Sequence, residues 1–286
     1  MNLEFKYSKH YDLVLHALTH MKVNNASDLY DENYIEKMNQ VRQNKNILMR
    51  IGTLSEYYHN HFERLMLIGF LPYFCSDYEN MKKCFLTFDR FAAEDLAYFI
   101  KPFIQILDDE SKFFFDYWDG VHQCNEDLRN DVEHKFAAEL QKYSCVFEHY
   151  NKPVMTIFSY NITRNGRGID NNTHFSALIP FPENDGSFLF SFFQALHEYT
   201  HQFTDALLNA NINMQDGSHD LSEKVVILAD YYLIKALDNG RLNAYFEWLS
   251  MYGTPVNEVN FFDIYGVEGR LDFTLRNTVD SILLRI

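Results

Sequence analysis

The first half of the chain carries the hydrophobic spacing of α-helices. Leu128, Val132, Phe136 and Leu140 stand four residues apart, directly after an acidic pair that suits the first turn of a helix. Similar spacing recurs towards the N-terminus. The pattern predicts helices over residues 11–21, 33–41, 55–68, 90–107 (with a kink at Pro102) and 127–147.

The pattern changes after residue 150. Val154–Tyr160 is rich in β-branched and aromatic residues, and His174–Phe181 is a second extended run that ends in prolines. Asn165–Gly168 between them has the composition of a turn. Two strands joined by a short connection predict an antiparallel hairpin.

Helical spacing returns beyond the predicted strands, over residues 189–210, 222–237 and 271–284. The order of elements is therefore many helices, a small sheet and further helices, and the expected fold class is α+β, mostly α. No repeat, low-complexity tract or Gly/Ser linker is present. The change of character at Asn151–Pro153 divides the chain into a helical N-terminal region, residues 1–150, and a second region, residues 151–286.

The charge balance narrows the classes of partner. The chain has 25 basic and 40 acidic residues, a net charge of −15, and its densest basic run is Lys82-Lys83. Binding to nucleic acid or to an anionic membrane needs a clustered basic face, so neither partner is expected. The oligomeric state stays open.

Targeting and cysteine signals point to a cytoplasmic protein. Charged residues are spread through residues 1–20, which leaves no signal-peptide core, and no apolar run is long enough to span a bilayer. The four cysteines have no C-x-x-C spacing, so we expect reduced thiols and neither a zinc ribbon nor a thioredoxin-type motif.

The segment His197-Glu198-Tyr199-Thr200-His201 has the pattern H-E-x-x-H inside a predicted helix. Residues four apart on an α-helix differ by about 40° around its axis, so His197 and His201 project from one face. Two imidazoles on one face are a bidentate site for zinc.

Glu198 lies about 100° around the helix from His197, too far to ligate with it but close enough to reach a water molecule on the metal. Zinc lowers the pKa of such a water, and Glu198 would act as the general base. The surrounding helix is apolar and follows a predicted strand, and this setting favours a functional motif over two chance histidines.

A catalytic zinc needs a third protein ligand and keeps its fourth position for water. Glu223, at the start of the apolar helix predicted over 222–237, is the best candidate, and Asp220 or Ser222 can cap that helix. His219 and Asp220 in the same loop, and Asp230 two turns further along, remain alternatives.

His197, Glu198, His201 and a glutamate 22 residues after the second histidine resemble the gluzincin clan of zinc peptidases, the thermolysin-like group. The resemblance covers about residues 153–237. It implies a zincin-like core: a small sheet, the HExxH helix and an antiparallel helix that carries the glutamate. It also implies that substrate binds along an edge strand, and His174–Ile179 is the segment assigned to that role.

Two features depart from the clan. Its members usually have an aspartate four residues after the ligand glutamate that orients the first histidine, where this chain has Ile227. Asp230, Asp205 or a backbone carbonyl must take that role. No motif identifies the residue that would stabilise the oxyanion. The candidates are Tyr231, Tyr232, Tyr252 and Tyr265.

The sequence therefore predicts a cytoplasmic zinc peptidase that acts on peptides or proteins, with Zn²⁺ held by His197, His201 and Glu223 and with Glu198 as general base. Two other functions remain possible on the same motif. One is a non-catalytic zincin-fold protein with a regulatory or binding role, against which the presence of Glu198 weighs. The other is a zinc hydrolase that acts on a non-peptide amide.

Overall fold

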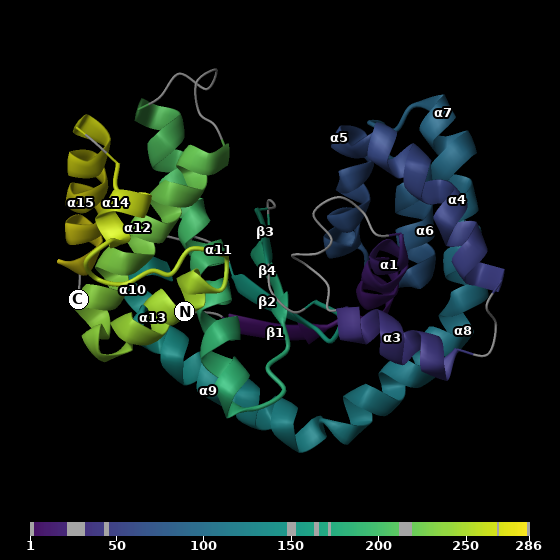
Figure 1. Cartoon of the computed structure of the whole chain (residues 1–286), viewed down its shortest axis with the longest axis horizontal. Helices are drawn as coiled ribbons and strands as arrows, with labels where there is room; N and C mark the ends of the chain where they lie inside the picture. Colours follow the sequence, from purple (N-terminus) through teal and green to yellow (C-terminus); the bar gives the residue numbers. More distant parts are fainter. Residues whose placement is uncertain are drawn as a thin grey trace. The chain divides into compact units, whose positions relative to one another are not determined.

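A computed structural model describes residues 3–21, 32–42, 46–147, 153–162, 166–170, 173–211, 219–267 and 269–284. The chain forms two compact units. Unit 1 comprises residues 1–5, 130–156 and 166–286, and unit 2 comprises residues 6–129 and 157–165. The division expected at residues 151–153 falls largely on residues outside the described part. The mostly helical α+β class predicted from the sequence is confirmed (Figure 1).

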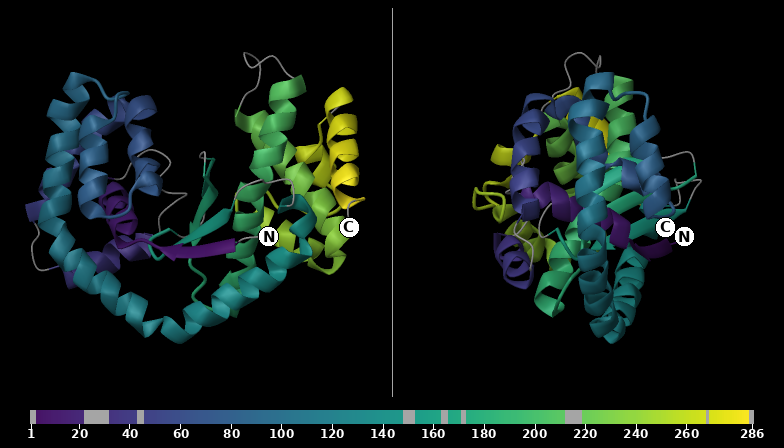
Figure 2. Two further views of the ribbon diagram at one scale, coloured as in Figure 1. Left: turned by 180° about the vertical axis from the view of Figure 1, so that it is seen from behind. Right: turned by 90° about the vertical axis from the view of Figure 1, so that its right-hand side faces the viewer.

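Unit 2 is helical, and α1, α4 and α8 pack against one another within it (Figure 2). Ser8 caps α1 by accepting a hydrogen bond from the backbone N–H of Tyr11. Pro102 lies at the start of α8, directly after the π-helix η3 (Leu96–Ile100). The elements are α1 (Lys9–His20), α3 (Glu32–Val41), α4 (Asn46–Asn60), α5 (Phe62–Leu65), η1 (Met66–Gly69), η2 (Leu71–Phe74), α6 (Tyr78–Thr87), α7 (Ala93–Asp95), the π-helix η3 (Leu96–Ile100) and α8 (Lys101–Cys124).

A charged network lies in the core of unit 2. His16 Nε2 is 2.9 Å and Arg42 Nη2 is 2.7 Å from Glu110 Oε2, and His16 Nδ1 is 2.8 Å from the hydroxyl of Tyr34. All four residues are buried, so pairing offsets the cost of removing their charges and dipoles from water. His20 Nδ1 donates to the carbonyl of His16 at 2.8 Å.

Unit 1 holds the strands and the motif helix. Its helices α11, α12 and α15 contact one another and lie side by side in Figure 1. The elements that lie in it or enter it are β1 (Leu3–Tyr7), α9 (Glu126–Lys142), α10 (Ser144–Phe147), β2 (Val154–Ser159), β3 (Arg167–Asp170), β4 (Phe175–Pro180), α11 (Asp185–Asn211), α12 (His219–Leu237), η4 (Asn239–Arg241), α13 (Leu242–Ser250), α14 (Phe261–Tyr265) and α15 (Arg270–Leu283).

The sheet has the strand order β1-β2-β4-β3. Strand β3 pairs antiparallel with β4 in the register Arg167↔Leu178 to Asp170↔Phe175. The predicted hairpin between the runs at 154–160 and 174–181 was wrong, because a further strand, β3, lies between them in the sequence and pairs antiparallel with β4. The first two residues of β3, Arg167 and Gly168, belong to the turn expected at 165–168. Asn165, the first residue of that expected turn, lies outside the described residues.

The assignment of His174–Ile179 to an edge strand was also wrong. Strand β4 lies between β2 and β3, and all of its residues are buried. A strand with neighbours on both sides and both faces covered is typically a nearly continuous apolar run, and β4 is apolar except for Ser176. The end strand on this side of the sheet is β3.

In the part of the chain that the structure describes, no helix has the length and hydrophobicity to cross a membrane. Cys75, Cys84 and Cys124 are free thiols, in keeping with the reduced state expected for them.

Candidate metal centre

Helix α11 presents opposite faces to the sheet and to α12. It begins four residues earlier than the spacing predicted, because the Asn184 side chain accepts from the N–H of Ser187 and starts the helix at Asp185. Tyr199 is buried on the sheet side, where its hydroxyl hydrogen-bonds Thr156 of β2. Residues two positions from Tyr199 lie about 200° around the axis. His197 and His201 therefore face away from the sheet.

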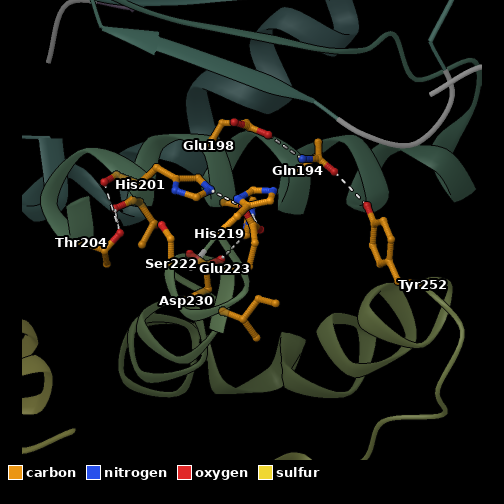
Figure 3. Close-up of polar contacts among 12 residues, drawn as sticks. Gln194, Glu198, His201, Thr204, His219, Ser222, Glu223, Asp230 and Tyr252 are labelled. Atoms are coloured by element: carbon orange, nitrogen blue, oxygen red, sulfur yellow. Dashed lines mark hydrogen bonds and ion pairs between the residues drawn. The ribbon is translucent and has the colours of Figure 1, made fainter. Parts of the chain in front are cut away.

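Both histidines converge on Glu223 of α12. Figure 3 shows His201 and Glu223 at this point. His197 Nε2 is 3.2 Å from Glu223 Oε2, and His201 Nε2 is 3.5 Å from Glu223 Oε1. One ligand atom from each of the three residues lies within 4.8 Å of the others, so this group could hold a metal ion. It is the one such group of histidine, cysteine and acidic side chains within the described residues.

Glu223 thus occupies the place expected of the third ligand. Its helix begins at His219, three residues before the predicted start, so Ser222 does not cap it. His219 is 84% exposed, and its Nδ1 lies 3.6 Å from Glu223 Oε1. It neighbours the group without belonging to it.

Carboxylates lie behind both histidines. His197 Nδ1 donates to Asp230 Oδ2 at 3.2 Å, and His201 Nδ1 lies 3.7 Å from Asp205 Oδ1. Ser222 donates to Asp205 Oδ1 at 3.1 Å and so links that carboxylate to α12. A carboxylate on Nδ1 fixes the ring and leaves Nε2 as the metal-facing nitrogen. Of the alternatives that the sequence offered for orienting the first histidine, the structure places Asp230 beside His197, whereas Asp205 lies beside His201.

The pairs along the two helices also set their direction. The residue numbers decrease along α11 as those of their partners on α12 increase. The three pairs are Asp205 with Ser222, His201 with Glu223 and His197 with Asp230. The two helices are therefore antiparallel.

The electrostatics of the group favour a cation. Burial lowers the pKa of His197, but hydrogen bonds to Asp230 and Glu223 outweigh burial and raise it to about 10. Burial likewise lowers the pKa of His201, whereas Asp205 and Glu223 raise it to about 9. Burial raises the pKa of Glu223, but the two imidazoles hold it well below its usual range.

These residues fit a zinc ion. Two imidazole nitrogens and one carboxylate oxygen are a donor set of catalytic zinc sites. Asp230 is fully buried, and its Oδ1 has no hydrogen-bond partner. A buried, unpaired carboxylate oxygen is costly without positive charge nearby. A divalent ion bound at Nε2 of His197, across the imidazole ring from Asp230, would supply that charge.

Glu198 lies beside the group but is not part of it. The side chain is buried, and Gln194 Nε2 donates to its Oε1 at 2.9 Å. Burial raises the pKa of Glu198, and the nearby His197 and His201 oppose that shift. On its other side is β3, where a Cβ on Gly168 would lie 3.0 Å from Glu198 Oε2. A buried carboxylate with a raised pKa is suited to accept and return a proton.

The hydroxyl groups of three tyrosines considered for oxyanion stabilisation have different hydrogen-bond partners in the structure. Tyr231 accepts from Lys235 Nζ at 3.0 Å and Tyr232 donates to Asp272 at 3.1 Å, so both hydroxyls have partners outside the group. Tyr252 donates to Gln194 Oε1 at 3.0 Å (Figure 3).

Sequence reasoning missed Gln194. Its position four residues before Glu198 is the signal that could have revealed it, because such residues are neighbours on one helix face.

No protein-family model, curated protein or solved structure matches the chain.

Proposed function

We propose that this protein is a zinc-dependent peptidase of gluzincin type, with zinc held by His197, His201 and Glu223. The observation that carries the proposal is the convergence of both Nε2 atoms on Glu223 while both Nδ1 atoms face carboxylates. This arrangement is that of ligands oriented for one ion. A small sheet, the HExxH helix and an antiparallel helix with a glutamate follow one another in the order of the zincin core.

When bound, zinc polarises a carbonyl group and makes a water molecule more acidic. The chain itself supplies the proton carrier. Glu198 accepts a proton from the water that attacks the amide carbon and returns it to the leaving nitrogen, so the amide and water become a carboxylic acid and an amine. The burial of Glu198 suits this role because it raises the pKa of the carboxyl group and so makes the carboxylate a stronger base for taking up the proton.

We assign the substrate to the end strand β3, in place of the segment first expected. Gly168 of β3 brings the backbone of that strand close to Glu198. A peptide added beside β3 as a further strand would therefore extend past the general base.

The test compares purified wild type with the Glu198→Gln and Glu223→Gln variants. Zinc content is measured by mass spectrometry of the metal, and activity is measured on a mixed-sequence peptide library. We expect one zinc ion per chain in the wild type and in Glu198→Gln, loss of peptide cleavage in Glu198→Gln, and loss of both zinc and cleavage in Glu223→Gln. Glu183→Gln, at an exposed position of the same unit, is the matched control.

A zinc-loaded wild type that cleaves no peptide would contradict the peptidase. If it cleaved non-peptide amides instead, with the same dependence on Glu198, the hydrolase would act on another substrate. If it cleaved neither, a non-catalytic binding role would follow.

A further inference from the structure

A chain of two hydrogen bonds ends on Glu198. Tyr252 donates to Gln194 Oε1 at 3.0 Å, and Gln194 Nε2 donates to Glu198 Oε1 at 2.9 Å (Figure 3). Because the hydroxyl of Tyr252 donates to the amide oxygen of Gln194, the amide NH₂ group of Gln194 faces Glu198. The orientation of Gln194 is thus set by Tyr252.

The loop after α13 places Tyr252. Gly253 has φ = 123°, a conformation that side chains other than glycine rarely adopt. The hydroxyl of Ser250 accepts from the N–H of Val256 at 2.8 Å and closes the loop. The ring of Tyr252 packs edge-on against Trp248, with centroids 5.5 Å apart. The ring of Trp248 in turn lies 5.8 Å from that of His197.

Two glycines of the β3 region cover the other side of Gln194 and Glu198. A Cβ at Gly166 would lie 2.8 Å from Gln194 Cγ, and one at Gly168 would lie 3.0 Å from Glu198 Oε2. Residues two apart on a strand are separated by about 6.6 Å, and one turn of helix rises about 5.4 Å. The spacing of the two glycines is therefore close to that of Gln194 and Glu198, which lie one turn apart on α11. Gly166 and Gly168, which the sequence suggested were part of a turn, therefore lie close against this pair of side chains.

We propose that Gln194 is a positioning residue for Glu198, and that Tyr252 acts through Gln194 by holding its amide. The proposal rests on the proposed function. Gln194 occupies Oε1 of Glu198 and leaves Oε2 to exchange the proton, while the glycines restrict where the carboxylate can move. A base held in one orientation contributes to catalysis because misplacement by about 1 Å can cost about a hundredfold in rate.

The experiment uses the zinc-loaded full chain and the variants Gln194→Met and Tyr252→Phe. Gln141→Met, the same exchange at an exposed position of unit 1, is the control. Crystal structures report the position of the Glu198 carboxylate, metal analysis reports zinc content, and peptide cleavage reports kcat and KM. In Gln194→Met we expect a displaced or divided Glu198 carboxylate, unchanged zinc, and a kcat lower by about tenfold to a hundredfold with KM unchanged. Tyr252→Phe should lower kcat less, by about threefold to tenfold, because Gln194 can still donate.

An unmoved Glu198 with kcat within twofold of the wild type in Gln194→Met would overturn the proposal. A larger loss in Tyr252→Phe than in Gln194→Met would also overturn it, because Tyr252 would then act on the substrate directly. Should the wild type cleave no peptide, the proposed function fails separately, and the crystal structures still decide whether Gln194 holds Glu198. Tyr252→Phe removes one atom from a partly exposed loop residue, so it remains informative if Gln194→Met does not fold.

Discussion

His197 on α11 and Asp230 on α12 meet across the two helices, with Nδ1 of the imidazole 3.2 Å from Oδ2 of the carboxylate. Asp230 is fully buried and His197 nearly so. The contact holds the ring in the orientation that directs Nε2 at Glu223. His201 has a looser carboxylate neighbour within its own helix, with its Nδ1 3.7 Å from Oδ1 of Asp205, four residues further along α11.

This difference predicts unequal effects of two matched substitutions. Asp230→Asn removes the charge behind a buried imidazole, so zinc affinity should fall about tenfold to a hundredfold. Asp205→Asn should have an effect near the lower end of that range or below it, because Asp205 is 54% exposed and water can replace it. Competition with a chromophoric chelator measures both affinities. Equal losses in the two variants would show that burial of the carboxylate does not matter.

Zinc binding at pH 7 should release about two protons. The pKa of His197 is raised to about 10 and that of His201 to about 9, so both rings are protonated in the metal-free protein, whereas ligands must be neutral. Zinc affinity should therefore increase as the pH rises from 7 towards 9. Calorimetric titrations in two buffers of different ionisation enthalpy measure the release. A value below half a proton would show that the rings are already neutral.

The stability of unit 2 should depend on His20 in acid. Burial, aided by the nearby His16, lowers the pKa of His20 from 6.5 to about 3. Between these values the unfolded chain binds a proton that the folded chain does not, so stability falls as the pH decreases from 6.5 towards 3. From pH 6.5 to pH 4.5 the loss should be about 2 kcal/mol.

Urea unfolding of wild type and His20→Gln over this pH range tests the prediction. The glutamine cannot take up the proton, so the variant should lack that part of the pH dependence. His134→Gln, at an exposed position, should keep the full dependence of the wild type. Parallel curves for the wild type and His20→Gln would contradict the assigned pKa.

Gly168→Ala should impair activity without releasing zinc. The new Cβ would lie 3.0 Å from both Glu198 Oε2 and Phe175 Cζ, so the carboxylate must shift. We expect a fall in kcat of about tenfold with zinc content unchanged. Gly120→Ala on α8 is the control, since nothing lies within 4 Å of its added Cβ, and it should gain about 0.5–1 kcal/mol of stability. Unchanged kcat in Gly168→Ala would show that Glu198 has room to move.

Several features followed from the sequence alone because they depend on local spacing. Helical periodicity identified α11 and α12, and the interval between His197 and His201 placed both rings on one face. Interruptions were harder to predict. The helix expected over 55–68 is divided into α4, α5 and η1, and that over 127–147 into α9 and α10, and no glycine or proline within these stretches marks the breaks.

The sheet was predicted least well. Strand β1 alternates apolar and charged residues, but over only five positions, and β3 has four residues without such alternation. Both are strands because β2 and β4 offer edges for pairing. The inner position of β4 was missed because it depends on β3 pairing beside it, and β3 was not predicted as a strand.

The sequence by itself determined the chemistry available to this protein: two imidazoles and a carboxylate on one helix, and a short set of acids downstream. Only the tertiary structure decided among those acids. Glu223 faces both Nε2 atoms, Asp230 and Asp205 lie behind the rings, and Gln194 joins Glu198 to Tyr252. The reason is geometric. The contacts of Asp205 with His201 and of Gln194 with Glu198 join residues four apart on α11, but the other roles depend on the register of two helices, or of a helix and a loop, far apart in the chain.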